Sequence, residues 1–129
     1  MGGAFGSGGQ VAALDPQTGA IRWTFTPNGP VQSSVASADG KVFFSTNVAR
    51  GTLYALNASS GRLDWSYTPS PQQFMFGSPV VADGLVIAPS DNGHVYAFAS
   101  GVPDVKAVVN VTALAGLDAG QLGNVSVRV

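Results

Sequence analysis

The sequence predicts an all-β protein built from four-stranded antiparallel units that repeat every 42 residues. Two observations carry this prediction. A segment at residues 13–23 returns at residues 55–65 and begins a third time at residues 97–101. Between these copies, short apolar runs flank Asp-Gly dipeptides, the strongest short-range signal of a β-hairpin. Repetition on this scale indicates stacked units that cannot bury their apolar faces alone.

Each copy of the repeated segment predicts a hairpin. Apolar residues alternate before the turn, as in Val11 and Ala13, because every second strand residue points to the same sheet face. The turn at residues 15–19 begins with an aspartate that can bond backbone amides and ends with a glycine that accepts a positive φ. The second strand is rich in strand-favouring types. Its alternating residues are Ile21, Trp23 and Phe25 in the first copy and Leu63, Trp65 and Tyr67 in the second.

The residues between the copies predict a second hairpin in each unit. Its first copy pairs residues 31–36 with 41–45 through the turn at 38–40. Its second copy spans residues 79–88 around the turn at 82–84. Together with the motif hairpins, these pairs give four strands per 42 residues.

Four antiparallel strands in this length are the blade of a β-propeller, in which radial repetition leaves only short edges exposed. Half a blade comes first, a whole blade follows at residues 31–67, and about three strands occupy residues 78–100. We therefore expect a partial β-propeller of about two and a half blades within residues 1–101. Propellers close with about four to eight blades. We expect a piece of a longer polypeptide, with ring closure by association of copies as the alternative.

The repeated segment resembles the tryptophan-docking motif of quinoprotein-type β-propellers, which carry pyrroloquinoline-quinone-like repeats. Residues 13–23 match the family pattern A-x-D-x-x-T-G-x-x-x-W at every fixed position, and residues 55–65 depart from it twice. The resemblance implies that each tryptophan wedges against small residues of the neighbouring blade. The WD-type propeller has a similar period, but its Gly-His and Trp-Asp pairs are not repeated here. The motif residues are Ala13, Asp15, Thr18, Gly19 and Trp23, then Ala55, Asn57, Ser60, Gly61 and Trp65, and finally Ala97.

The motif is absent from residue 102 onward. Alternating residues from Val105 to Ala113 predict one further strand, and Val125, Val127 and Val129 predict another. We expect residues 102–129 to form a C-terminal β segment that starts a following domain. The alternative is that one of these strands completes the third blade.

Composition excludes several classes of partner. Charged residues make up 10% of the chain and its net charge is −1, so no basic stripe supports nucleic acid or an anionic membrane as a partner. No apolar run reaches the roughly 18 residues of a membrane span. Residues 1–9 lack the basic start and apolar run of a signal peptide. An extracytoplasmic location, whether periplasmic, secreted or at the cell surface, is implied only by the family resemblance.

Catalytic, cofactor-binding and metal-binding residues are not predicted in this chain. By resemblance, quinoprotein dehydrogenases hold pyrroloquinoline quinone (PQQ) and calcium with carboxylates that include glutamate, and commonly have a vicinal cysteine pair. This sequence contains no Glu and no Cys. Calcium sites need several convergent oxygen ligands, whereas the seven aspartates stand singly and mostly in turns. The single histidine, His94, is expected to be a solvent-facing strand residue.

The predicted function is a non-catalytic module that binds a protein or ligand or serves as a scaffold. Its expected partners are the remaining blades of the propeller or further copies of the chain, and a protein. The alternative is part of a PQQ-dependent dehydrogenase whose catalytic site lies on blades absent from this chain, and only this alternative requires PQQ and calcium.

One loop stands out as a candidate contact site. Residues 69–76 form a longer connection that ends in Phe74, Met75 and Phe76, and loops of this kind tend to carry binding. Packing at a strand edge is the alternative for these side chains. Sequons at Asn57, Asn110 and Asn124 are glycosylation acceptors only in a secretory eukaryotic setting.

Overall fold

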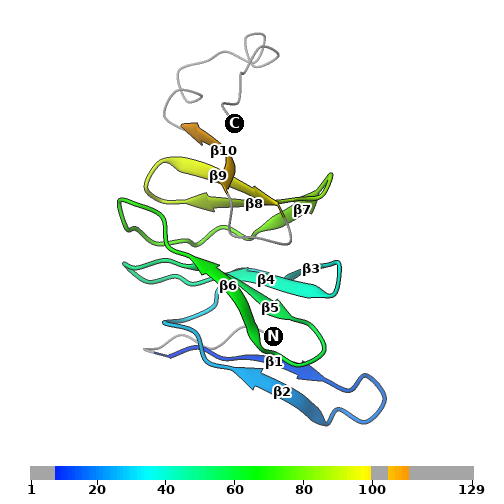
Figure 1. Ribbon diagram of the computed structural model, residues 1–129. Coiled ribbons are helices and arrows are strands. Elements are labelled where there is room, and N and C mark those ends of the chain that lie inside the picture. The colour runs from blue at the N-terminus through cyan, green and yellow to red at the C-terminus, as the bar shows by residue number, and fades with distance from the viewer. Residues whose placement is uncertain (1–7, 100–104, 111–129) are drawn as a thin grey trace.

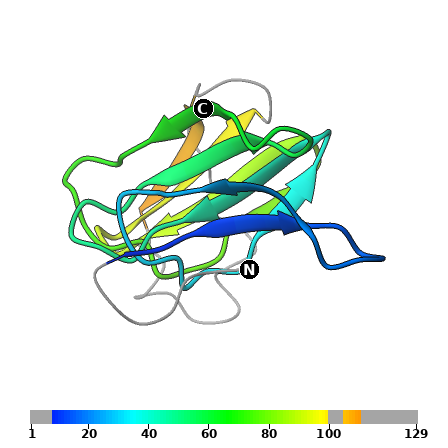
Figure 2. The same ribbon diagram turned by 90° about the horizontal axis from the view of Figure 1, so that it is seen from below.

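The computed structural model describes residues 8–99 and 105–110, and every element within them is a β-strand. The strands form one two-stranded and two four-stranded antiparallel sheets. These sheets follow one another as stacked layers along the chain (Figures 1 and 2). The predicted all-β fold of repeated antiparallel units is confirmed. In the described part of the chain, no helix is long and apolar enough to span a membrane.

We call the three sheets unit one, unit two and unit three in chain order. Unit one is the motif hairpin alone, and units two and three each contain four strands in a simple up-and-down order (Figure 1). Unit one comprises β1 (Val11–Leu14) and β2 (Ile21–Phe25). Unit two comprises β3 (Ala36–Ala38), β4 (Lys41–Ser45), β5 (Leu53–Asn57) and β6 (Leu63–Tyr67). Unit three comprises β7 (Val80–Ala82), β8 (Leu85–Ser90), β9 (His94–Ala99) and β10 (Val105–Asn110).

The first strand of unit two is shorter than its sequence predicts. A strand was expected over residues 31–36, but β3 begins only at Ala36. Val31 is 1% exposed and anchors the connection from β2 to β3 in the core. Ser33 is held by side-chain bonds to the backbone of Ser45 instead of a strand ladder. The apolar residues of this stretch therefore belong to a crossover.

Both Asp-Gly turns have the geometry that their sequence predicts. Asp39 and Gly40 have φ values of 52° and 72°, and Asp83 and Gly84 have 53° and 74°. Positive φ at both central positions defines the type I′ turn, whose twist matches that of the strands it joins. These turns fix the registers of β3 with β4 and of β7 with β8.

The three motif hairpins share one register, including an irregularity at the same place. In each hairpin, an alanine of the first strand pairs with the motif position of the second strand beside a register shift. A β-bulge of this kind increases the local twist of the strand pair. The three pairs are Ala13 with Trp23, Ala55 with Trp65, and Ala97 with Ala107.

Unit three therefore has a fourth strand, which its sequence predicted only as the alternative arrangement. Residues 102–129 were expected to begin a following domain, whereas β10 (Val105–Asn110) pairs with β9 and completes the sheet. For β10, the structure has the alternative arrangement, in which a strand after residue 102 completes the third unit. Residues 111–129, which contain the second predicted strand, lie outside the described residues.

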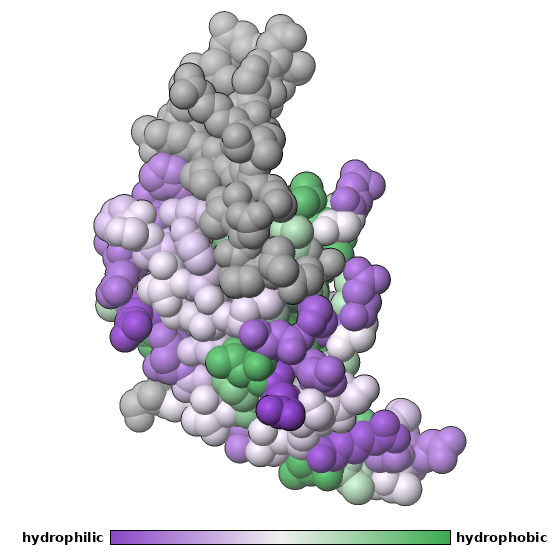
Figure 3. Space-filling view, in the orientation of Figure 1, coloured by the Kyte–Doolittle hydropathy of each residue, from purple (hydrophilic) through white to green (hydrophobic). Residues whose placement is uncertain are grey.

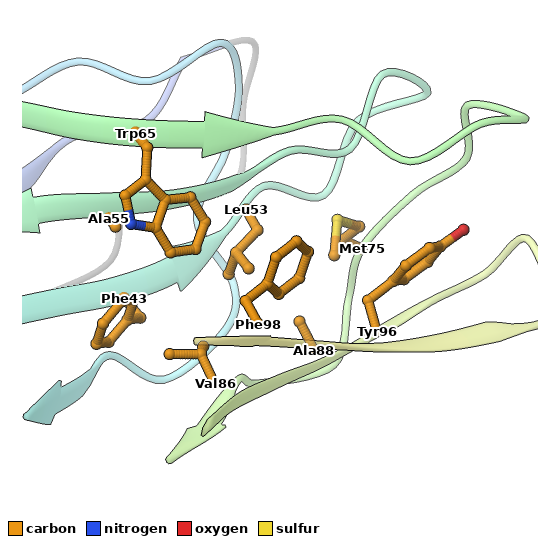
Figure 4. Packing of buried hydrophobic residues seen from close by; sticks show 9 residues of the cluster. All are labelled: Phe43, Leu53, Ala55, Trp65, Met75, Val86, Ala88, Tyr96 and Phe98. Carbon is orange, nitrogen blue, oxygen red and sulfur yellow. The ribbon is translucent and has the colours of Figure 1, made fainter. Parts of the chain in front are cut away.

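The core lies between the sheets. At the first junction, side chains of unit one pack on the near face of unit two, and at the second junction the far face of unit two packs on unit three. Alternation along β4 sends Phe44 to the first junction and Phe43 to the second. Buried residues of the first junction are Val11, Val31, Phe44, Tyr54 and Leu56. Those of the second are Phe43, Leu53, Ala55, Trp65, Met75, Val86, Ala88, Tyr96 and Phe98 (Figure 4).

Candidate functional site

Trp23 of unit one packs on the motif turn of unit two. Its indole Nε1 donates a hydrogen bond to the carbonyl oxygen of Ala58 at 2.8 Å. A Cβ added at Gly61 would lie 2.5 Å from the Trp23 ring, far inside van der Waals contact. Gly61 also has a φ of 73°, which disfavours any side chain. Glycine is therefore required at residue 61 for two reasons: its positive φ and the space that the Trp23 ring occupies.

The two motif turns are built alike despite their sequence differences. Asp15 Oδ1 accepts from two backbone amides of its turn at 2.8 and 3.1 Å, and Asn57 Oδ1 does the same at 2.9 and 3.1 Å. The hydroxyls of Thr18 and Ser60 each accept from the amide two residues later at 3.3 Å. Only the charge differs. The Arg22 guanidinium, followed by the turn amides, holds the pKa of Asp15 below its usual value.

Trp65 fills the junction between units two and three. It is 6% exposed, and its ring centroid lies 6.1 Å from that of Phe43 and 5.5 Å from that of Phe98 in unit three (Figure 4). Its Nε1 atom has no acceptor among the described residues. Ala97, the motif alanine of unit three, is also buried. Contacts between aromatic rings therefore stabilise the packing of unit two on unit three.

The crossover loop from β6 to β7 exposes an aromatic side chain on each side of a buried methionine. Phe74 is 41% exposed and Phe76 is 58% exposed, whereas Met75 between them is 1% exposed. Met75 is thus a core anchor, and the candidate contact loop is reduced to the two phenylalanines. Other large apolar side chains reach the surface at scattered positions of the three units (Figure 3). They are Leu14, Ile21, Val35, Leu63 and Val80.

The loop is held by turns of two different units. Backbone hydrogen bonds attach it to the β4–β5 connection of unit two and to the β8–β9 turn of unit three. The close approach requires glycine at residue 51, where a Cβ would lie 2.4 Å from the Gln73 carbonyl oxygen. The backbone of the loop is therefore held at Gln73, Phe74 and Met75. The bonds run from Gly51 to Gln73 (3.0 Å), from Met75 to Thr46 (3.3 Å) and from Asp91 to Phe74 (2.9 Å).

The remaining polar residues have structural contacts. His94 is half-buried, with its Nδ1 atom 3.3 Å from Asn92 Oδ1 and its ring beside that of Tyr96. Within the described ranges, no three His, Cys, Asp or Glu side chains come together as a potential metal site.

Comparison with known proteins identifies relatives for most of the chain. A family model described as outer membrane protein assembly factor BamB matches residues 7–102. The dehydrogenase subunit of a quinone alcohol dehydrogenase from Gluconobacter oxydans is 31% identical, in an alignment covering 60% of this chain and 13% of that protein. An equivalent subunit from Komagataeibacter europaeus is also 31% identical, again over 13% of its length. The chain thus spans a small part of these curated relatives.

Solved structures show the same fold. BamB from Moraxella catarrhalis superposes with a TM-score of 0.68 at 22% identity, covering 84% of this chain and 34% of that one. Quinohemoprotein alcohol dehydrogenase from Comamonas testosteroni superposes with a TM-score of 0.68 at 26% identity, covering 80% of this chain and 18% of that one.

Proposed function

Because the chain belongs to the PQQ-like β-propeller repeat family described as outer membrane protein assembly factor BamB, we propose that it is a non-catalytic propeller module that binds a protein and acts as a scaffold. The observation that supports this role is the pair of exposed phenylalanines on a loop fixed by two units. Binding surfaces benefit from groups that are already ordered, because little conformational entropy is lost on association.

The scaffold would owe its rigidity to the junctions between units. We propose that the Trp23 contact with Ala58 and Gly61 is the tryptophan docking that the motif implies, and that Trp65 acts likewise at the second junction. The solved relatives are larger than this chain. Further blades of the same propeller are therefore proposed as its partners. An extracytoplasmic location is proposed from the outer-membrane description of the family.

A second candidate function is favoured by the identity of 31% to quinone alcohol dehydrogenase subunits. In that case the chain would be part of a dehydrogenase whose PQQ and calcium are held by blades beyond these residues. Neither candidate places the cofactor on the described residues, so the two differ in whether the complete propeller, with its proposed further blades, binds PQQ.

Titration of the complete propeller, with the proposed further blades present, with PQQ and calcium distinguishes the two candidates. Both tryptophans lie at junctions and report on changes there by fluorescence. We expect no saturable quenching, because the proposed module is non-catalytic and holds no cofactor. Saturable quenching at micromolar PQQ that a chelator abolishes would favour the dehydrogenase and contradict the proposed function.

A further inference from the structure

The two crossover loops of the chain share one backbone hydrogen bond at the same place. In the first, the amide of Asn47 donates to the carbonyl of Pro30 at 2.9 Å, and in the second the amide of Asp91 donates to that of Phe74 at 2.9 Å. The next residues, Val31 and Met75, are each 1% exposed. Pro30 and Phe74 therefore occupy equivalent positions, immediately before the buried anchor.

Close approach of a glycine repeats at the same two places. A Cβ at Gly9 would lie 2.4 Å from the carbonyl oxygen of Gly29, and a Cβ at Gly51 would lie 2.4 Å from that of Gln73. By this second match, Gln32 and Phe76 occupy equivalent positions, each one residue after the buried anchor of its loop. The sequence after the anchor thus reads Gln in one loop and Phe in the other.

The fold does not require phenylalanine at either position. The first crossover has the same hydrogen bond and buried anchor with Pro30 and Gln32, which are half-buried, whereas Phe74 and Phe76 are exposed. Core packing is supplied by the anchor between them. An exposed aromatic pair that the scaffold does not need is typical of a binding site, since aromatic residues dominate interface energetics.

We propose that Phe74 and Phe76 bind an extended apolar segment of a partner protein, an assignment that rests on the proposed binding function. Residues 68–78 contain no charged side chain, so the loop is electrostatically suited to an uncharged segment. The backbone amide and carbonyl of Phe76 bond to none of the described residues. They are available to pair with an extended backbone, which adds affinity in strand-type recognition.

The size of the aromatic pair argues against a second copy of this chain as the occupant. Each phenylalanine buries at most about 200 Å², which gives roughly 400 Å² for the pair. A stable dimer buries about 800 Å² on each partner. A single segment that inserts one or two apolar side chains matches the available surface better.

The test exchanges the phenylalanines for the residues of the first crossover. The double variant Phe74→Pro and Phe76→Gln keeps the loop type, because the Phe74 amide takes part in none of the loop's hydrogen bonds. Leu63→Ser is the matched control, since Leu63 is 49% exposed at the opposite end of β6. The single variant Phe76→Gln serves as a milder test should the proline perturb folding, which circular dichroism and the melting midpoint would reveal.

The probe is a fluorescein-labelled peptide that alternates Leu and Thr, compared with a Ser and Gln peptide of equal length by fluorescence anisotropy. We expect the natural chain and Leu63→Ser to bind the Leu and Thr peptide, and the double variant to bind it at least about tenfold more weakly. Equal binding by the folded double variant would overturn the site while leaving the binding function intact. Lack of peptide binding by the natural chain would overturn this inference, as would dimerisation lost in the double variant, which would identify a second copy as the occupant.

Discussion

Gly19 and Gly61 occupy the same position of the two motif turns and share a φ of 73°. Only Gly61 lies against a side chain of another unit. A Cβ at Gly19 meets nothing within 4 Å, whereas a Cβ at Gly61 meets the Trp23 ring at 2.5 Å. The backbone need for glycine was predictable from the turn sequence. The second need was not, because it depends on a residue of another unit.

The two glycines therefore form a matched pair for measuring the junction. Gly19→Ala should lower the free energy of unfolding by about 1 kcal/mol, the cost of the left-handed conformation. Gly61→Ala should cost a further 1 to 3 kcal/mol or so, because the Trp23 ring must move. Urea unfolding followed by circular dichroism measures both values. Equal losses would show that Trp23 does not rest on Gly61.

Asp15 should confer a pH dependence that the second turn lacks. Its pKa is lowered in the folded state, first by the Arg22 guanidinium, whose Nη2 lies 2.8 Å from Oδ2. The stabilisation is therefore present above the pKa of the unfolded chain and is lost as the pH falls through the lower folded pKa, in the range below about pH 4. Asp15→Asn, which reproduces Asn57 of the second turn, should remove this contribution.

Carbon-13 shifts of the Asp15 carboxyl provide the measurement. The titration midpoint should lie below that of an unstructured aspartate, and Arg22→Gln should raise it. An unshifted midpoint in the natural chain would mean that the ion pair does not persist in solution.

At the scale of the element, turns were predictable and crossovers were not. Asp-Gly specifies the type I′ geometry by itself, since both residues tolerate a positive φ. Residues 31–36 were predicted as a strand because they precede an Asp-Gly turn, as residues 79–81 do in the next unit. In the structure Val31 is a crossover anchor and Val35 is exposed. Whether this stretch is a strand or a crossover depends on which residues are buried in the tertiary structure, and a local sequence pattern does not contain that information.

The turn of β7 with β8 offers the prediction at this scale. Asp83 has a φ of 53°, so Asp83→Val should destabilise the chain by about 1 to 2 kcal/mol, because a β-branched residue is strained there. Asp83→Asn should be close to neutral, since asparagine tolerates the same conformation. Melting midpoints of the two variants test the assignment. A valine variant as stable as the asparagine variant would contradict the type I′ turn.

At the scale of the whole molecule, the period of 42 residues predicted the stack of units. The last strand of unit three, β10, was predicted as part of it only as the alternative, because this copy of the motif has no tryptophan. Val105 follows Leu63 by one period, and Ala107 occupies the position of Trp65. The alternating strand pattern is present there, but the tryptophan that marks this strand in the other two units is absent. The family assignment followed from two complete motif copies. Loop length predicts the contact loop, but the burial of Met75 between two exposed phenylalanines depends on tertiary packing that the local sequence does not contain.

The central claim is that consecutive units pack face to face through their motif tryptophans. A double-mutant cycle across the second junction tests it most directly, with Trp65→Phe and Phe98→Leu measured singly and together by urea unfolding. The two rings lie 5.5 Å apart and belong to different units. Conservative replacements keep the chain folded. Trp65→Phe combined with Phe25→Leu, at the other junction, provides the control pair.

The cycle across the junction should give a coupling energy of about 0.5 to 1.5 kcal/mol, the value of an aromatic contact beyond its buried area. The control pair should be additive within about 0.3 to 0.5 kcal/mol. Additivity of Trp65→Phe and Phe98→Leu, in variants shown to be folded, would mean that units two and three do not pack through this tryptophan.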